Sequence, residues 1–282
     1  MRLTVDGHDV YAYTGTRALV AAQPTVVFVH GAANDHSVWA LQSRYFAHHG
    51  HNVLAFDLPG HGRSGGAALP AVDAIADWLP RALDAAGVAA AALVGHSLGS
   101  LAALACAARH PQRVTKIALL GPAVPMPVSD ALLAAAQADD HVAFELINGW
   151  SHSAARQIGG NKVPGMWMTG AALRLMERTR PGVLHTDLLA CHAWEGGLSA
   201  AAAVRCPALV VMGARDLMAP PKGAQALVSA LADKRVTTLP GTGHALMAEQ
   251  PDAVLDALRA FLQLRAPEAA RTDAPPRAGG RS

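Results

Sequence analysis

Residues 93–99, Leu-Val-Gly-His-Ser-Leu-Gly, join an apolar run directly to an Ala- and Leu-rich stretch. The run predicts a buried strand, and the stretch that follows it predicts a helix. A strand that turns straight into a helix strains the backbone at the apex, where only small neighbours fit. Gly95 and Gly99 meet this requirement on either side of Ser97. The pattern therefore predicts a serine held clear of the backbone at a helix N-terminus, where free N–H groups favour negative charge.

Strands and helices alternate along most of the chain. Apolar runs predict strands at residues 3–7, 10–15, 25–31, 52–57, 92–97, 114–121, 207–213 and 236–241. Helical spacing predicts helices at residues 39–50, 71–87, 98–110, 223–233 and 252–264. Such alternation is typical of an α/β protein in which a mostly parallel sheet carries helices on both faces.

The alternation stops between residues 124 and 203. This segment has no strand-like run, and it is too long for an ordinary loop. Its helical stretches, at residues 131–149 and 170–180, predict a small helical unit. We therefore expect a core formed by residues 1–123 and 204–265, with a helical cap inserted at 124–203. The Pro-, Ala- and Gly-rich tail, residues 266–282, is expected to be disordered.

Composition narrows the class of protein. The chain of 282 residues is 51% hydrophobic and 16% charged, which is typical of globular proteins. Its net charge is +2 and its basic residues are scattered before the tail, so we expect no nucleic-acid partner. The longest apolar stretch, residues 85–95, is too short to span a membrane. A polar N-terminus and three cysteines far apart in the chain predict a cytoplasmic protein with reduced thiols and no zinc site.

Ser97 needs partners if it is to act as a nucleophile, because a free serine hydroxyl is a weak one. A histidine has to take its proton, and an acid has to orient the histidine. Where a strand-turn-helix serine is catalytic, the acid and the histidine follow later strands in the order Ser, Asp, His. Asp216 follows the strand at 207–213, and His244 follows the strand at 236–241. We therefore predict Ser97, Asp216 and His244 as catalytic residues; the alternative is that Ser97 only turns the chain.

Other histidines and acids compete for these roles. His96 is adjacent to Ser97, but in so tight a turn it is expected to point elsewhere. His30 ends a strand, and it either leans into the pocket or bonds only to backbone. Asp57 also ends a strand, but it precedes Ser97 in the chain. We expect its carboxylate to accept backbone hydrogen bonds within the glycine-rich loop at 57–66.

Two backbone N–H groups are expected to stabilise the oxyanion that attack by Ser97 would create. One belongs to Leu98, the residue after the serine, and the other to Ala32, in the loop after the strand at 25–31. The same loop is also explained as an ordinary strand-to-helix turn capped by Asp35 or Ser37. The two interpretations are compatible.

Five motifs occur in a fixed order along the chain. They are HGAANDHSVW at 30–39, DLPGHGRSGG at 57–66, LVGHSLGS at 93–100, VMGARDLMAPP at 211–221 and LPGTGHALMAEQP at 239–251. Together they resemble the α/β-hydrolase superfamily, in its branch with a Ser-His-Asp triad. The resemblance implies an eight-stranded, mostly parallel sheet, a helical cap over the site, and no cofactor or metal. Serine rather than aspartate at position 97 argues against the haloalkane dehalogenase and epoxide hydrolase branches, and HGAAN lacks the HGGG of one lipase and esterase branch.

The substrate depends on the pocket, which the fold does not specify. We expect a small or medium carboxylic ester, because an ester makes the fewest demands on the pocket. The alternatives are a C–C bond hydrolase of diketone-type ring-cleavage products, a thioesterase, a cofactor-free perhydrolase, and a non-catalytic small-molecule receptor of the same fold. A C–C hydrolase needs polar or basic groups to hold a substrate carboxylate, and the candidates are Arg156, Lys162 and Arg174. The residues expected to line the pocket are His30, Phe144, Trp150, Trp167 and Met168, although each of the last four could instead pack in the core of the cap.

Overall fold

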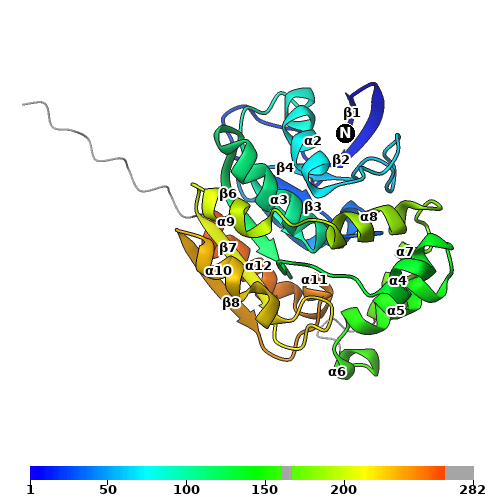
Figure 1. Cartoon of the computed structure of the whole chain (residues 1–282). Coiled ribbons are helices and arrows are strands. Elements are labelled where there is room, and N and C mark those ends of the chain that lie inside the picture. Colours follow the sequence, from blue (N-terminus) through cyan, green and yellow to red (C-terminus); the bar gives the residue numbers. More distant parts are fainter. Residues whose placement is uncertain (161–164, 166, 264–282) are drawn as a thin grey trace, which may run out of the picture.

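The sheet is the scaffold of the molecule, and most of its strands are parallel. The computed structural model describes residues 1–160, 165 and 167–263. Within these residues eight strands form one sheet in the order β1-β2-β4-β3-β5-β6-β7-β8 (Figure 1). The strands are β1 (Arg2–Val5), β2 (His8–Tyr13), β3 (Thr25–Val29), β4 (Asn52–Phe56), β5 (Ala91–His96), β6 (Val114–Leu120), β7 (Ala208–Gly213) and β8 (Lys234–Leu239). The pairs β1–β2 and β2–β4 are antiparallel and the other pairs are parallel, which confirms the predicted architecture.

Helices cover both faces of the sheet, because its central strands are apolar on both sides. The core helices are α1 (Ala40–His48), α2 (Val72–Ala85), α3 (Leu98–Arg109), α9 (Gly197–Ala203), α10 (Gln225–Ala230), α11 (Leu246–Glu249) and α12 (Pro251–Leu262). On β3, Val27 and Val29 belong to a buried cluster with residues of α2 and α3. Val26 and Phe28 belong to a second cluster, with residues of α1 and α12. This alternation follows from the two-residue period of a strand buried on both faces.

The segment between β6 and β7 is helical wherever it is regular in the described residues. It contains α4 (Asp130–Gln137), α5 (Val142–Ser151), α6 (Ala154–Gln157), α7 (Met168–Met176) and α8 (Val183–His192), followed by α9. Helices α4, α5, α7 and α8 share a buried cluster that includes Leu132, Met176 and Leu188. Helix α9 instead contacts α3 and α10 of the core. We call residues 130–192 the insertion; Figure 1 shows α4 to α7 standing apart from the core helices on one side of the molecule.

The predicted elements differ from the observed ones mainly at their ends. The helix expected at 39–50 is preceded by a 3-10 turn, η1 (His36–Trp39). The turn starts there because the Asp35 carboxylate accepts the N–H of Ser37 at 2.8 Å, as the capping interpretation of this loop predicts. The helix expected at 223–233 is a 3-10 turn, η3 (Pro221–Ala224), followed by the short α10. Pro80 lies inside α2 without ending it.

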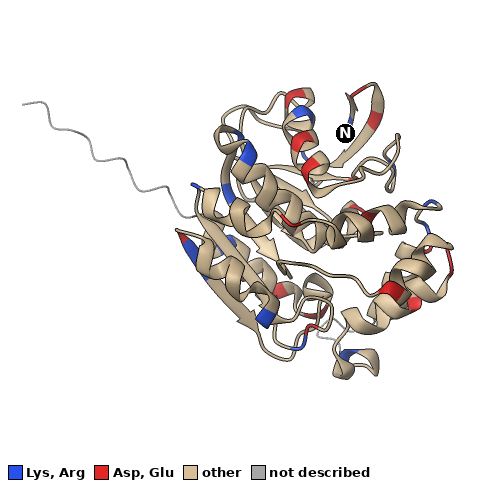
Figure 2. Cartoon of the chain, in the orientation of Figure 1, with Lys and Arg blue, Asp and Glu red and all other residues tan. Residues whose placement is uncertain are grey.

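Charged residues of both signs are interspersed around the outer helices in the view of Figure 2. Several are paired, as Arg109 is with Asp77 at 2.6 Å. Among the described residues, no helix combines the length and the apolar character needed to cross a membrane. Lys162 and the tail at 266–282 lie outside the described residues.

Candidate active site

Ser97 sits at the sharp turn between β5 and α3. Its backbone is in the left-handed region, with φ of 52° and ψ of −121°, which a non-glycine residue rarely adopts. A Cβ added at Gly95 would overlap the carbonyl of Gly99, and one added at Gly99 would overlap the carbonyl oxygen of Val29. Both glycines are therefore required by close backbone approach, and together they let the serine stand at the apex of the turn.

His244 and Asp216 meet in the loops that follow β8 and β7. Nδ1 of His244 lies 2.7 Å from Oδ2 of Asp216, and the two residues are only 5% and 3% exposed. The other oxygen of Asp216 accepts the N–H groups of Met218 and Ala219, at 2.8 and 2.7 Å. Because the carboxylate is an acceptor, Nδ1 carries the hydrogen and Nε2 of neutral His244 keeps a lone pair for a proton. His244 and Ser97 line the same cavity, as expected where parallel strands end.

The ring of His96, the neighbour of Ser97, points toward the backbone of the loop after β8, which carries His244. Its Nε2 donates to the carbonyl oxygen of His244 at 2.9 Å, and the two rings have centroids 4.7 Å apart. Burial, with a smaller effect from His244, lowers the pKa of His96 to about 3. His96 is therefore a neutral support for the loop that carries His244.

The peptide between Gly31 and Ala32 has its N–H directed away from His30. The carbonyl oxygen of Gly31 accepts Nδ1–H of His30 at 2.8 Å and the N–H of Asn34 at 3.3 Å. In a trans peptide the C=O and N–H point in opposite directions, so the N–H of Ala32 points to the other side. Ala32 lines the cavity beside Ser97. Leu98 begins α3, so its N–H belongs to the first turn and has no acceptor within the helix.

His30 does not line the cavity, contrary to one of the two interpretations given above. It is 0% exposed, and its Nε2 accepts the N–H of Leu58 at 3.1 Å. Burial lowers its pKa to about 4. With both ring nitrogens used by backbone groups, His30 is a structural link between the loops after β3 and β4, which is the other interpretation.

A cavity of about 1060 Å³ lies above Ser97, between the core loops and the insertion. Trp150 and Met168 are among its lining residues, together with Met126, Ile147, Leu188 and Met247. Trp167 and Phe144 are not among its lining residues. Trp167 is 72% exposed and lies over Gly170, while Phe144 packs against the insertion's own apolar cluster. The sequence does not indicate Met126 or Met247 as lining residues, because Met126 lies on a loop and Met247 on the single-turn helix α11, and neither segment is long enough to show a periodic pattern.

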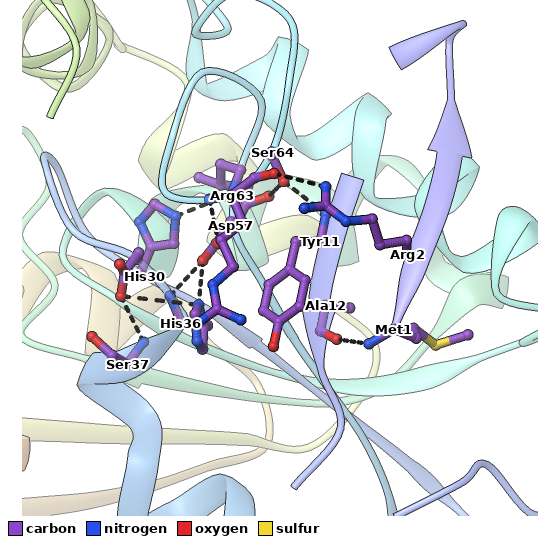
Figure 3. Close-up of polar contacts among 12 residues, drawn as sticks. Met1, Arg2, Tyr11, Ala12, His30, His36, Ser37, Asp57, Arg63 and Ser64 are labelled. Carbon is purple, nitrogen blue, oxygen red and sulfur yellow. Dashed lines mark hydrogen bonds and ion pairs between the residues drawn. The ribbon is translucent and has the colours of Figure 1, made fainter. Parts of the chain in front are cut away.

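Both carboxylate oxygens of Asp57, the rival acid, already accept hydrogen bonds from the loops after β3 and β4. One oxygen accepts the N–H of His36 and contacts Nδ1 of the same residue, at 2.8 and 2.7 Å, and the other accepts the N–H of Arg63 at 2.8 Å (Figure 3). Burial raises the pKa of Asp57, but these hydrogen bonds outweigh it and leave the pKa below its usual value. Asp35, His36 and Asp57 are also close enough to hold a metal ion, but their carboxylates already serve backbone N–H groups.

Comparison with known proteins places the chain in a family. Residues 24–251 match the family model for the alpha/beta hydrolase fold. The chain is 32% identical over 256 residues to a pimeloyl-[acyl-carrier protein] methyl ester esterase of Chromobacterium violaceum, a match that covers 86% of this chain and 96% of that protein. A match of 38% identity to the dihydrolipoyllysine-residue acetyltransferase component of an acetoin cleaving system in Cupriavidus necator covers 42% of this chain and only 30% of that protein. The crystal structure of an enol-lactonase from Burkholderia xenovorans superposes with a TM-score of 0.81 at 23% identity, covering 93% of this chain and 99% of that one. The chain therefore belongs to the α/β-hydrolase fold family.

Proposed function

We propose that this protein is a serine hydrolase that cleaves carboxylic esters through an acyl-enzyme. The observation that carries the proposal is the 2.7 Å contact between the buried Asp216 and His244, which lines the same cavity as the strained Ser97. These residues come from three turns or loops that follow β5, β7 and β8. The arrangement meets the requirements of an activated serine, namely a base and an acid that orients the base.

The reaction proceeds in two halves in this proposal. Nε2 of His244 takes the hydroxyl proton as Ser97 attacks the ester carbonyl, and Asp216 stabilises the resulting imidazolium. The N–H groups of Ala32 and Leu98 receive the oxyanion. His244 then gives its proton to the leaving alkoxide, and water hydrolyses the acyl-enzyme by the same route. The insertion acts as a cap that encloses the acyl group and limits access of water.

The chemistry of the cavity favours an uncharged ester. Its lining is largely aliphatic and methionine side chains, which suit an apolar acyl or alcohol group. A C–C hydrolase of ring-cleavage products would need a cation for the substrate carboxylate. Arg174 and Arg178 line the cavity, but both are exposed to solvent and Arg174 is also paired with Glu177 at 2.7 Å; Arg156 is not among the lining residues. The relatives named as methyl ester esterases, which this chain matches over most of its length, also support ester cleavage.

The test is hydrolysis of p-nitrophenyl esters of increasing acyl length, beside one vinylogous diketone, by the wild type and by Ser97→Ala. We expect turnover of short and medium esters and a loss of at least about 10³-fold in Ser97→Ala. A fluorophosphonate should label the wild type on the peptide that contains Ser97. Hydrolysis that survives the substitution would refute the assignment of Ser97. Tight binding of an ester analogue without any turnover would favour the small-molecule receptor.

The cytoplasmic location and the absence of a nucleic-acid partner stay predictions. Cys106, Cys191 and Cys206 are free thiols in the structure, which supports a reducing compartment. Fractionation of the native host, followed by esterase assay of each fraction, is the direct measurement.

A further inference from the structure

Ala33, the residue after the proposed oxyanion donor Ala32, is held by the insertion on both of its polar groups. Its N–H donates to Oδ2 of Asp187 at 2.9 Å, and its carbonyl oxygen accepts the hydroxyl of Thr179 at 3.2 Å. Asp187 lies on α8 and is 1% exposed, and Thr179 lies just before that helix. Asp187 and Ala33 are 154 residues apart in the chain. Two residues of the insertion therefore hydrogen-bond to the backbone N–H and carbonyl of one residue in a core loop.

These two hydrogen bonds hold a residue whose backbone is strained. Ala33 has φ of 53°, in the left-handed region that an alanine adopts only when its surroundings enforce it. The peptide before it is fixed at both ends, because the carbonyl of Ala32 accepts Nδ2 of Asn34 at 3.1 Å while the N–H of Ala33 is held by Asp187. If the hydrogen bond to Asp187 were lost, the backbone of Ala33 could relax to a more common conformation. That rotation would also turn the neighbouring peptide, which carries the N–H of Ala32.

Asp187 is itself held in place by a buried histidine. Nε2 of His61 lies 2.8 Å from the same Oδ2, and Nδ1 of His61 lies 3.0 Å from the carbonyl oxygen of Pro59. Both partners are acceptors, so an imidazolium, which donates from both ring nitrogens, satisfies both contacts. Burial lowers the pKa of His61, but the charge and hydrogen bond of Asp187 outweigh it and raise the pKa above its usual value. Arg180 adds a further bond from the insertion to the same loop, to the carbonyl of Ser64 at 2.6 Å.

We propose that Asp187 is a positioning residue for the oxyanion hole: from the insertion, together with Thr179, it holds Ala33 so that the N–H of Ala32 stays directed into the cavity. The oxyanion hole is then complete only when the insertion is docked on the core. This inference rests on the proposed function. It differs from a purely structural role, in which the same contacts would only fasten α8 to the core and would affect stability alone.

The experiment compares three variants with the wild type on the best p-nitrophenyl ester. Asp187→Ala removes the acceptor of Ala33, and we expect kcat to fall about 10- to 100-fold with KM changed less than about threefold, because a misdirected oxyanion donor weakens transition-state binding. Asp187→Asn keeps an oxygen that can accept both bonds and should retain kcat within about fivefold. The matched control is Asp139→Ala: Asp139 accepts the N–H of Gly182, the residue that precedes α8, at 2.7 Å, a bond of the same type that does not involve Ala33. It should leave kcat unchanged.

A second measurement reports on the tetrahedral state without turnover. Phenylboronic acid forms a tetrahedral adduct with an active serine, and its affinity should weaken in Asp187→Ala in parallel with kcat, while staying at the wild-type value in Asp139→Ala. If Asp187→Ala does not fold, Thr179→Val replaces it, since it removes the other bond from the insertion to Ala33. The expected loss in kcat is then about 3- to 10-fold.

The outcomes separate this inference from the proposed function. A wild type that hydrolyses no ester would overturn both. An active wild type whose kcat and boronate affinity are unchanged by Asp187→Ala, or by Thr179→Val in its place, would overturn the positioning role alone. A rise in KM with kcat unchanged, or an equal fall in kcat in the Asp139→Ala control, would also overturn it.

Discussion

The substitution Asp216→Asn tests whether the acid does more than hold a loop together. One oxygen of Asp216 accepts two N–H groups, from Met218 and Ala219, and the other faces Nδ1 of His244. An asparagine of the same shape must keep its oxygen toward the two N–H donors. Its NH₂ group then faces Nδ1, which has to become an acceptor. The hydrogen of neutral His244 therefore moves to Nε2, the atom that should accept the proton of Ser97.

The expected loss follows from this change of tautomer. The histidine would keep its position but could no longer act as a base, and it would also lose the negative charge that stabilises its imidazolium. In a serine protease with a Ser-His-Asp triad, the same exchange of aspartate for asparagine lowers kcat about 10⁴-fold. That corresponds to about 5 kcal/mol of transition-state stabilisation. Stability should change little, because the two N–H bonds of Asp216 are retained.

The assay is hydrolysis of a p-nitrophenyl ester, with urea unfolding of the same preparations. Asp57→Asn is the matched control, since Asp57 is an equally buried carboxylate that also accepts two backbone N–H groups. We expect Asp57→Asn to lower the free energy of unfolding and to leave kcat within about tenfold. Retention of more than a tenth of wild-type kcat in Asp216→Asn, or a greater loss in Asp57→Asn, would refute the assignment of the acid.

Three further outcomes follow from the packing and from the titrating groups. Gly99→Ala should lower the free energy of unfolding by more than about 3 kcal/mol, because its Cβ would overlap backbone carbonyls. Gly87→Ala, which has open space around it and φ of 70°, should lower it by only about 1 kcal/mol. Urea unfolding of the two variants measures this difference. Glu249→Ala should lower the free energy of unfolding by about 2–5 kcal/mol and should lower kcat, because the buried carboxylate accepts two N–H groups and a hydroxyl from the insertion and from the loop that carries His244. Thermal unfolding measures the first effect and ester hydrolysis the second. A stable, fully active variant would contradict this prediction. Burial lowers the pKa of His30 from 6.5 to about 4. The contribution of the neutral ring to the free energy of unfolding, on the order of 3 kcal/mol, is therefore fully present above pH 6.5 and is lost as the pH falls through about 4. The free energy of unfolding should fall over this pH range, and less steeply in His30→Asn.

The sequence predicts the position of a residue well where that position depends on local chain geometry. A strand, a turn and a helix in immediate succession require glycines beside Ser97, and this requirement is visible in seven residues. Asp216 and His244 could be placed because each follows a strand, and parallel strands bring their ends to one edge of the sheet. The prediction that Asp57 serves backbone N–H groups rested on the same kind of local argument, from a glycine-rich loop.

The pocket could not be predicted in the same way, because it is formed by contacts between distant parts of the chain. Whether Phe144 or Met168 faces the cavity depends on how the helices of the insertion pack on one another, and their amphipathic patterns do not specify a partner. Trp167, which is expected in the pocket from its place in the insertion, instead lies outside it, on Gly170. Asp187 and Glu249 carried no sequence signal at all, since a buried acid is recognised only once its partners are in place.

The contacts of the insertion divide its residues into two groups with different expected effects. It is anchored on the loop after β3 through Thr179 and Asp187, and on the loop after β8 through Ser151, whose carbonyl accepts the N–H of Ala245 at 2.9 Å. Between these anchors it presents apolar side chains such as Ile147 to the cavity. An anchor acts on the geometry of the reacting groups, which is common to every substrate, so its loss should lower kcat for all esters alike. A cavity residue contacts only the acyl or alcohol group, so Ile147→Ala should change the ranking of kcat/KM among acyl lengths and leave kcat for the preferred ester nearly intact. Proportional losses for every ester in Ile147→Ala would show that the insertion does not separate specificity from turnover in this way.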